Sequence, residues 1–328
     1  MNRRSSIVLA VLLALSTLLL GCASATTVTI VVNQTATNCT SGDFFNSTIQ
    51  GAINNASGGD TIIVCDDVTY NESVVVNKSV TLLGANNSAQ VNASVPDNHV
   101  FNVSENYVNI SGFVIRNATG DGKAGIYVGG WNNTNITNNT ISSNNYGIYL
   151  NQSNYSALIN NAISDNSGLG IFSSSSSNNN ISDNIVERNS NGPGMYLLSC
   201  TNNSIINNTL VSNYQGIYLN TGSDSNNLSY NNVSNNSAYG ILILSSAGNT
   251  LRNNTINSSG IINLYVFGMA ASDYNHSIDT SNTVNGSPVY YYFGQSDFVF
   301  TNETRHLTVA NATNVTVRNN NVSSGDPI

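Results

Sequence analysis

The stretch NNTISSNNYGIYLN, residues 138–151, decides the fold because close variants of it return along the chain. NNAISDNSGLGIF (160–172) and NNTLVSNYQGIYLN (207–220) keep the same order of asparagine, aliphatic residue, glycine and aromatic residue. Aligned on the glycine, the phrase recurs in steps of 22, 23, 24, 22 and 24 residues, at Gly125, Gly147, Gly170, Gly194, Gly216 and Gly240. A period of this length, with short β-branched runs and Asn/Gly corners, is typical of a solenoid.

A second pattern indicates the geometry of each coil. Alternation within residues 147–150 places Ile148 and Leu150 on one face of a strand and Tyr149 on the other. We therefore predict an all-β, parallel β-helix with three short strands in each 22–24-residue coil and with inward side chains stacked in columns. Apolar residues five positions apart support this frame: Ile136/Ile141, Leu158/Ile163, Ile181/Val186, Ile205/Leu210, Leu228/Val233 and Leu251/Ile256.

Asparagines stand at two fixed places in this frame. One set lies two residues before the second apolar position of each pair: Asn139, Asn161, Asn184, Asn208, Asn231 and Asn254. The other lies three residues after it: Asn144, Asn166, Asn189, Asn213 and Asn236. Asparagine tolerates the left-handed backbone of a tight corner, and stacked carboxamides form hydrogen-bonded ladders. We predict that both sets point inward as structural ladders, because none of these residues begins an Asn-x-Ser/Thr sequon.

The composition limits the classes of partner. The chain has 328 residues, 9 Lys plus Arg against 17 Asp plus Glu, a net charge of −8 and only 8% charged residues. Solubility must therefore come from Asn, Ser and Thr, and an acidic chain without a basic stripe is not expected to bind nucleic acid. About thirty sequons, among them Asn33, Asn71 and Asn232, fit an exported glycoprotein, although a chain of this composition generates many of them by chance.

Residues 1–25 have the pattern of an export signal: Arg3 and Arg4, an apolar run, then small residues. Two cleavage patterns compete, a lipoprotein box ending at Cys22 and an ordinary signal-peptidase site at 23–25. The ordinary site is slightly favoured because Leu20 is bulky for a lipoprotein box. Both patterns predict a protein of the cell envelope or the extracellular space. Attachment to a membrane is expected only from the lipoprotein box, through a lipid on Cys22.

Three further regions are expected. Residues 26–60 should form an N-terminal cap with a short helix, because apolar residues between 49 and 53 have helical spacing and would cover the first coil. Residues 61–262 should form the coils, and 263–328 an irregular continuation whose C-terminal end is uncapped or truncated.

The cysteines are consistent with export. Cys39 and Cys65 flank the N-terminal region and could pair in an oxidising compartment. Cys200 is then left over, and we expect it to be a small buried residue rather than a reactive one.

The stretches TIQGAINNASGGDTIIV (48–64) and YNESVVVNKSVTLLGAN (70–86), followed by coils of the NNTISSNNYGIYL type, resemble the secreted right-handed parallel β-helix proteins. In particular they are similar to the NosD-like, carbohydrate-binding and sugar-hydrolase-type repeat proteins that are numerous on archaeal cell surfaces. NTVNGSPVYYYFG (282–294) resembles an insert between coil blocks in the same proteins. The resemblance implies the fold strongly and an activity weakly, because this fold hosts lyases, hydrolases, esterases, adhesins and copper-site accessory proteins.

The metal and cofactor sites that this resemblance implies find little support in the residues. Copper-site maturation would need a cluster of His, Met and Cys, and the sequence shows none. The carboxylates with a histidine on neighbouring coils that are typical of polygalacturonases are also missing, because His99, His276 and His306 are isolated. We predict no metal and no cofactor, with calcium only if the protein is a lyase.

Stacking of the coils predicts which charged residues meet. Asp165 and Arg188 hold the same coil position, so we expect them on adjacent coils about one strand spacing apart. An acid beside an arginine resembles polyuronate lyases, which use acidic residues for calcium and a basic residue to abstract a proton. The alternative, which we favour, is an exposed ion pair worth ~0–1 kcal/mol. Asp183 and Glu187 lie nearby, with no second carboxylate at matching height to form a glycosidase pair.

An aromatic row is the strongest surface feature. Two residues after each repeat glycine stand Tyr127, Tyr149, Phe172, Tyr196 and Tyr218, followed by Leu242. Alternation points these side chains outward, one per coil, as a platform on which sugar rings could stack. The competing interpretation, somewhat favoured, is that the row stabilises the sheet itself, since cross-strand aromatic pairs contribute ~0.2–1 kcal/mol each.

These observations favour an exported cell-envelope β-helix with a structural, adhesive or glycan-interacting role and with no catalytic site evident. Its expected partners are polysaccharides or surface glycans and envelope proteins. Two alternatives remain. One is a polysaccharide lyase or glycoside hydrolase acting on a cell-surface or environmental polysaccharide, and the other is a NosD-like accessory protein for a copper site.

Overall fold

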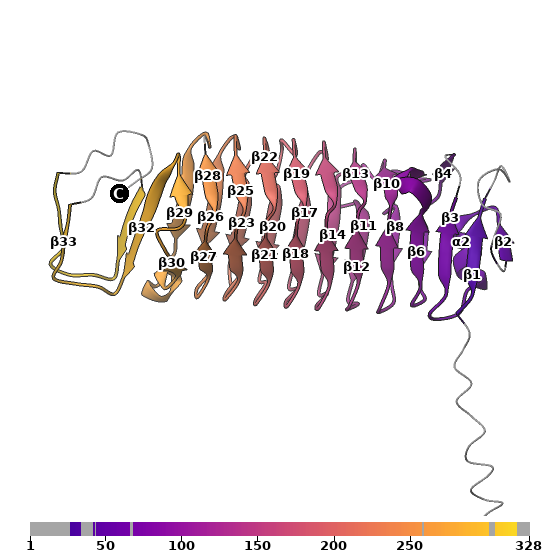
Figure 1. Ribbon diagram of the computed structural model, residues 1–328, viewed down its shortest axis with the longest axis horizontal. Coiled ribbons are helices and arrows are strands. Elements are labelled where there is room, and N and C mark those ends of the chain that lie inside the picture. Colours follow the sequence, from indigo (N-terminus) through magenta and orange to yellow (C-terminus); the bar gives the residue numbers. More distant parts are fainter. Residues whose placement is uncertain are drawn as a thin grey trace, which may run out of the picture.

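The computed structural model shows a long solenoid whose coils lie side by side along one axis (Figure 1). It describes residues 27–33, 42, 44–65, 68–257, 259–301 and 306–319. The predicted export signal, Cys22 and Cys39 lie outside the described residues.

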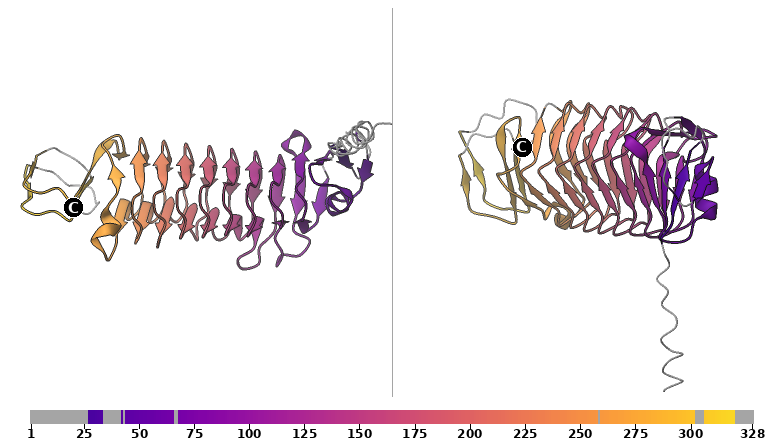
Figure 2. Two further views of the ribbon diagram at one scale, coloured as in Figure 1. Left: turned by 90° about the horizontal axis from the view of Figure 1, so that it is seen from below. Right: turned by 45° about the vertical axis from the view of Figure 1, so that its right-hand side comes forward.

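Each coil contributes one strand to each of three sheets that wrap around one core (Figure 2). Sheet A is formed by β1 (Thr29–Val32), β2 (Phe44–Asn46), β3 (Thr61–Val64), β6 (Thr81–Gly84), β9 (Asn109–Ser111), β12 (Asn135–Thr137), β15 (Ala157–Ile159), β18 (Asn180–Ser182), β21 (Ser204–Ile206), β24 (Asn227–Ser229), β27 (Thr250–Arg252) and β30 (Ser277–Ile278). Sheet B is formed by β4 (Thr69–Asn71), β7 (Ala89–Asn92), β10 (Phe113–Arg116), β13 (Thr140–Ser142), β16 (Ala162–Ser164), β19 (Ile185–Glu187), β22 (Thr209–Val211), β25 (Asn232–Ser234), β28 (Thr255–Asn257), β31 (Thr283–Val284), β32 (Ser287–Phe293) and β34 (His306–Ala310). Sheet C is formed by β5 (Val74–Val76), β8 (Phe101–Val103), β11 (Ala124–Gly129), β14 (Tyr146–Asn151), β17 (Ile171–Ser174), β20 (Met195–Leu198), β23 (Ile217–Asn220), β26 (Tyr239–Leu244) and β29 (Ile262–Phe267).

Equivalent residues of successive coils lie opposite one another, as the repeat predicted. In sheet B, Ile141 pairs with Ile163, and Ile163 pairs with Val186. All three side chains are buried, so the core is a column of stacked aliphatic residues. The predicted all-β parallel β-helix with three strands per coil is confirmed.

The corners of each coil share one backbone device. A residue with positive φ comes immediately before an inward polar residue, as in Asn138 (φ 55°) before Asn139 and Ser143 (φ 58°) before Asn144. This left-handed residue interrupts the alternation of the strand, so two successive side chains point outward before the next one turns in. The expectation that the ladder asparagines themselves adopt the left-handed conformation is therefore wrong, because the exposed residue before each of them does so.

The inward asparagines connect neighbouring coils. The amide nitrogen of Asn161 donates to the side-chain oxygen of Asn184 (3.0 Å) and to the carbonyl of Ile136 (2.8 Å). Its own side-chain oxygen accepts from the backbone and side-chain nitrogens of Asn139, each at 3.1 Å. The same pattern continues through Asn208, Asn231 and Asn254, and a second ladder runs through Asn144, Asn166, Asn189, Asn213 and Asn236.

Two further ladders were not predicted from the sequence. One follows the turn from sheet C to sheet A through Asn179, Asn203, Asn226 and Asn249, and ends on Nδ1 of His276. Its sequence signal was available, since each of these asparagines stands two residues before the first apolar position of a five-residue pair. The other runs through Ser153, Ser176, Cys200, Ser223 and Ser246, and it explains the leftover cysteine: the buried Sγ accepts from the backbone N–H of Ser176.

The N-terminal end is closed by the helix α2 (Ile49–Asn55). The Thr48 hydroxyl caps it by accepting from the N–H of Gly51, and its buried face consists of Ile49, Ala52 and Ile53. The region around this helix also contains strands β1 and β2, which extend sheet A beyond the first complete coil. Cys65 is disulfide-bonded; Cys39, the partner that the sequence favours, is not among the described residues.

At the other end the parallel order breaks. Strand β31 is followed by an Asn285-Gly286 turn with positive φ at both residues, and β32 then pairs antiparallel with β31. Beyond it, β32 pairs with β34, and β33 (Val299–Phe300) pairs with β35 (Thr316–Val317). The hairpin signal of an Asn-Gly dipeptide is the local cause of this reversal.

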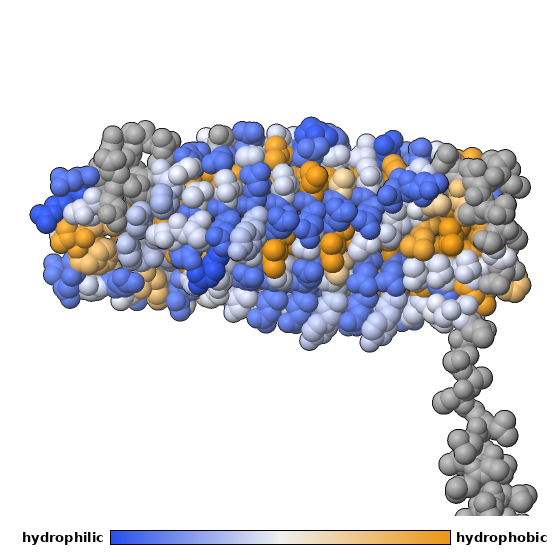
Figure 3. Space-filling view, in the orientation of Figure 1, coloured by the Kyte–Doolittle hydropathy of each residue, from blue (hydrophilic) through white to orange (hydrophobic). Residues whose placement is uncertain are grey.

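The surface explains how a chain with so few charges stays hydrated. Figure 3 shows a face that is mostly hydrophilic, with small apolar spots along the coils and a larger apolar patch toward the N-terminal end. Within the described ranges, no helix is long and apolar enough to cross a membrane.

Removing one rung of the first ladder should destabilise the protein. Asn184→Ala deletes the acceptor of Asn161 and a donor to Leu158 and Asn208, all of them buried. Unmade buried hydrogen bonds cost about 1–3 kcal/mol, so urea denaturation should show a loss in that range. Asn227→Ala, at an exposed position of sheet A, is the matched control and should change the free energy of unfolding by less than roughly 0.5 kcal/mol. Equal effects of the two changes would contradict the structural role of the ladder.

The ladder that ends on His276 should make stability depend on pH. Burial lowers the pKa of His276 from 6.5 to about 4, because desolvation disfavours the charged ring. The neutral ring accepts a hydrogen bond from the N–H of Asn249 at Nδ1. Its contribution, up to about 3 kcal/mol, is therefore complete above pH 6.5 and is lost as the pH falls toward 4. His276→Asn keeps an acceptor that does not titrate, and should flatten this part of a stability profile measured by urea unfolding between pH 7 and 4. An unchanged slope in the variant would contradict the assignment.

Candidate functional site

The predicted aromatic row lies on the outer face of sheet C. Ring centroids of successive members, from Tyr127 to Tyr218, are 5.1, 4.7, 5.2 and 4.8 Å apart. The rings from Tyr149 onward are stacked, with interplanar angles of 24°, 12° and 17°, whereas Tyr127 meets Tyr149 edge-on at 63°. His99 stacks on Tyr127 at 4.4 Å and lengthens the row toward the N-terminus. The row is half-buried, so one edge of each ring remains open to solvent.

Neighbouring coils hold the phenol groups in place. The amide of Asn220 donates to the Tyr196 hydroxyl at 2.8 Å, and the amide of Asn151 donates to the Tyr127 hydroxyl at 3.3 Å. Burial raises the pKa of the Tyr149 and Tyr218 hydroxyls above the ordinary value of 10, so both remain protonated under physiological conditions. Each phenol can therefore donate as well as accept a hydrogen bond.

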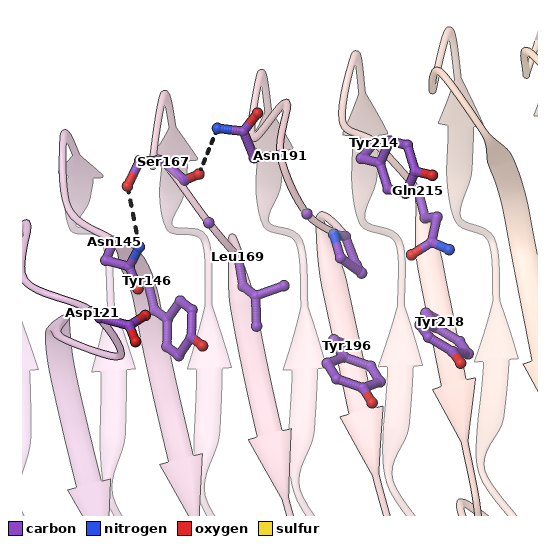
Figure 4. Close-up of a pocket in the computed structure, with 13 residues that line it drawn as sticks. Asp121, Asn145, Tyr146, Ser167, Leu169, Asn191, Tyr196, Tyr214, Gln215 and Tyr218 are labelled. Atoms are coloured by element: carbon purple, nitrogen blue, oxygen red, sulfur yellow. Dashed lines mark hydrogen bonds between the residues drawn. The ribbon is translucent and has the colours of Figure 1, made fainter.

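A groove of about 480 Å³ runs beside the C-terminal half of this row (Figure 4). Tyr196 and Tyr218 form one side of it, and the labelled side chains of Tyr146, Leu169 and Gln215 reach over it from successive coils. Hydrogen bonds link its rim across coils, from the amide of Asn145 to the Ser167 hydroxyl (3.2 Å) and from the amide of Asn191 to the Ser167 carbonyl (2.9 Å). The volume lies within the range of ordinary small-molecule sites, about 300–1,000 Å³.

The wall of the groove comes from the part of the repeat that varies in length. For the four glycines from Gly125 to Gly194, the spacing to the next residue of the second ladder is constant, as in Gly125 to Asn144 (144 − 125 = 19) and Gly170 to Asn189 (189 − 170 = 19). From Gly216 to Asn236 it is one residue longer (236 − 216 = 20), because the turn after β23 holds an extra residue. From the ladder asparagine to the next glycine the spacing changes from 3 (Asn144 to Gly147) to 4 and 5 residues in the following two coils. We call these segments, residues 119–124, 145–146, 167–169, 190–193 and 214–215, the groove loops. Apart from Tyr196 and Tyr218, every lining residue belongs to one of them.

Sequence reasoning missed the groove loops, although their signal was present in the unequal steps between repeat glycines. In the coils that build the groove, the ladders hold the rest of each coil at one length, so an extra residue bulges outward here. The groove is almost free of charge, because Asp121 is the only Asp, Glu, Lys, Arg or His among its lining residues. Burial, and then the nearby Asp121 carboxylate, raise the pKa of Tyr146, which therefore stays neutral.

A second cavity of about 380 Å³ lies at the N-terminal end of the same sheet. Val74, His99, Asn102 and Lys123 contribute to its lining. Burial, and then the Lys123 charge, lower the pKa of His99 to about 4, and its Nδ1 accepts from the N–H of Ala124 at 2.9 Å. The imidazole is thus neutral at physiological pH and is fixed in orientation by the backbone.

The four charged candidates lie apart from the groove. The Arg188 guanidinium contacts both carboxylate oxygens of Asp165 at 2.9 Å, with about half of each side chain exposed, and it also contacts Glu187. Asp183 lies at the opposite end of β19, where it accepts from the amide of Asn207 at 2.7 Å. Asp165, Asp183 and Arg188 all have positive φ, which shows that they occupy ordinary corner positions of their coils.

No group of three or more His, Cys, Asp or Glu side chains suited to a metal ion occurs in the part of the chain that the structure describes. Met195 and Cys200 are both buried in the solenoid.

The fold defines the class: the chain is a right-handed parallel β-helix. The family described as "Right handed beta helix region" matches residues 86–229. A segment of 96 residues is 40% identical to a "Cell surface glycoprotein" of Methanothermus fervidus. This segment covers 29% of the chain but only 15% of that glycoprotein, so the chain spans a small part of the relative's length.

Solved structures with the same fold include enzymes whose titles name two lyases and an epimerase. An alginate lyase from Paenibacillus sp. str. FPU-7 has a TM-score of 0.52 at 18% identity, over 83% of this chain and 96% of that one. The pectate lyase Pel9A has a TM-score of 0.52 at 17% identity, over 91% and 80% of the two chains. The A-module of the mannuronan C-5 epimerase AlgE4 of Azotobacter vinelandii reaches 0.55 at 12% identity, over 86% and 94%. At these identities the likeness shows the fold alone.

Proposed function

We propose that this protein acts on the outside of the cell as an envelope β-helix that holds glycan chains along the aromatic row and the groove beside it. The observation that carries the proposal is the union of the two features on sheet C. Tyr196 and Tyr218 belong to the row and also form one side of the groove. A ligand that follows the coils would therefore meet aromatic ring edges and amide groups together.

The chemistry of the face suits carbohydrate. A pyranose ring has an apolar C–H face that needs an apolar partner, while its hydroxyls need hydrogen-bond partners. The open edges of the stacked rings and the Leu169 side chain supply the apolar contact, and Asn145, Asn191 and Gln215 at the rim supply the hydrogen bonds. Because the row repeats once per coil, consecutive sugars of one chain could be held along the long axis.

Charge narrows the class of glycan. No lysine or arginine lines the groove, and its one ionised side chain is the acid Asp121. A polyuronate would bring a carboxylate on each residue and would gain no counter-charge there. We therefore infer that the ligand of the groove is neutral, such as a hexose or N-acetylhexosamine polymer.

The location rests on the similarity to a cell surface glycoprotein, on the sequons and on the export-signal pattern of residues 1–25. The structural neighbours support a glycan-related role, since their titles name an alginate lyase, a pectate lyase and a mannuronan epimerase. A structural or adhesive task in the envelope follows if the bound chains belong to the cell wall or to a neighbouring cell.

The double change Tyr196→Ala and Tyr218→Ala should weaken binding to neutral glycans on an array by at least about tenfold, which corresponds to about 1.4 kcal/mol. The changes remove the exposed edges of two rings, while the strands β20 and β23 keep their buried residues. Tyr230→Ala is the matched control, because Tyr230 is 61% exposed at the turn between β24 and β25, away from sheet C. Binding that survives the double change, or that falls equally in the control, would contradict the proposal.

The alternative of a lyase or hydrolase retains one specific support, the Asp165–Arg188 pair on a fold shared with polysaccharide lyases. As an exposed ion pair, it should contribute ~0–1 kcal/mol. Asp165→Ala should accordingly shift the urea midpoint only slightly and leave glycan binding unchanged. Cleavage of alginate, pectate or a neutral polymer by the natural protein, abolished by this change, would establish the enzyme instead.

A further inference from the structure

Sequons are distributed unevenly over the three faces of the solenoid. Between β11 and β28, those on sheets A and B and on the corner that joins them have exposed asparagines: Asn135, Asn138, Asn180, Asn207, Asn227, Asn232 and Asn253. On sheet C the sequons are Asn102 and Asn151, and both asparagines are half-buried. The amide of Asn151 is engaged by Tyr127, and Asn102 lines the second cavity.

The corner between sheets B and C, next to the groove, shows the same bias. Its left-handed residues are, coil by coil, Asn117, Ser143, Asp165, Arg188, Ser212 and Asn235. Only the first and last of these begin a sequon, Asn117-Ala-Thr and Asn235-Asn-Ser. The four between them flank the coils that build the groove, and the groove's own asparagines, Asn145 and Asn191, are not sequons either.

At two of those four positions, a single substitution to asparagine would create a sequon. Asp165 is followed by Asn166 and Ser167, and Arg188 by Asn189 and Ser190. An asparagine at either place would complete the acceptor pattern on a corner whose backbone already suits it. The sequence instead has an acid and a base there, which pair with each other across the coils.

We propose that N-linked glycans occupy the exposed asparagines of sheets A and B, with Asn117 and Asn235 at the two ends of the groove, and that sheet C stays unmodified. The modification thus coats two faces of the solenoid and leaves the third open. The proposal concerns where glycans are attached, and it stands whether or not the groove binds a glycan.

The attachment chemistry is compatible with these positions. A transferase of the secretory pathway would join Nδ2 of asparagine to the anomeric carbon of a lipid-linked oligosaccharide, breaking that carbon's bond to a phosphate oxygen and releasing one amide proton. One N–H remains on the nitrogen, so the bond from Asn207 to Asp183 can persist. Three acceptors lie on the corner between sheets A and B. At one strand spacing per coil, Asn138 and Asn207 are three coils or about 14 Å apart, and Asn207 and Asn253 are two coils or about 10 Å apart.

The test is glycopeptide mass spectrometry on the full chain secreted from a host with an active N-glycosylation pathway. Modified peptides should contain the exposed acceptors of sheets A and B together with Asn117 and Asn235. Peptides carrying Asn102 and Asn151 should be recovered unmodified. Glycans on those two, or a chain with no glycan on the exposed set, would overturn the proposal.

A second experiment introduces a new sequon. Asp165→Asn completes a sequon beside the groove, whereas Asp183→Asn removes the same charge at an equivalent corner and creates none, because Ile185 stands two residues later. The first variant should gain the mass of one glycan and the second should not. If Asp165→Asn stays unmodified while natural sites are occupied, the corner is not accessible to the transferase and the proposal fails.

Binding to glycan arrays then separates the two proposals. Asp165→Asn made in the glycosylating host should bind at least about tenfold more weakly than Asp183→Asn, and the same protein made without glycosylation should bind normally. If the glycans are found at the expected asparagines but the natural protein binds no glycan on the array, the proposed function is contradicted and the proposal on glycan attachment stands.

Discussion

The whole structure depends on each coil lying in register on the next at one strand spacing. Backbone N–H and C=O groups of every coil are then satisfied by the coils on either side. The corners are the weak points of such an arrangement, because there the chain leaves the sheets and its polar groups face the core. The inward amides meet this need: Asn161 uses its side chain to serve the coil before and the coil after it. Burial of so many polar side chains is tolerable only because the stacking is continuous.

The same register that orders the core also orders the surface. A residue type that repeats on the outward side forms a row along the solenoid. Tyr149, Phe172 and Tyr196 belong to such a row, and the spacing of their rings is close to that of the strands. The groove lies beside this row because, in the coils that build it, chain length varies at one edge of sheet C. The proposed binding surface and the core are therefore built from alternating positions of the same short strands.

Much of this could be predicted from the sequence. The glycine steps and the five-residue apolar pairs predicted the coil and the stacked core, and the helical spacing of apolar residues between 49 and 53 predicted the cap helix, because each depends on local period. The outward aromatic row followed from the same alternation. Among the catalytic candidates, Arg188 contacts Asp165, as the coil positions predicted, and also Glu187, whereas Asp183 lies at the opposite end of β19.

Besides the two further ladders, three features were not correctly predicted from the sequence. The groove depends on the length of segments of two to six residues whose shape is set by neighbouring coils, so no single segment predicts it. The left-handed residue at each corner was assigned one position too late, since Asn139 and Asn138 both suit that conformation by residue type. The reversal at Asn285-Gly286 carried a recognisable hairpin signal, which the dominant parallel repeat concealed.

The concentration of length variation in the groove loops, within the four coils from Gly125 to Asn213, has an evolutionary consequence. Coils of one ancestral sequence can duplicate and then gain or lose residues at this edge without disturbing the buried columns that they share. Each duplication would add a coil whose loop has its own shape, so new specificities could arise by rearranging coils along an unchanged core.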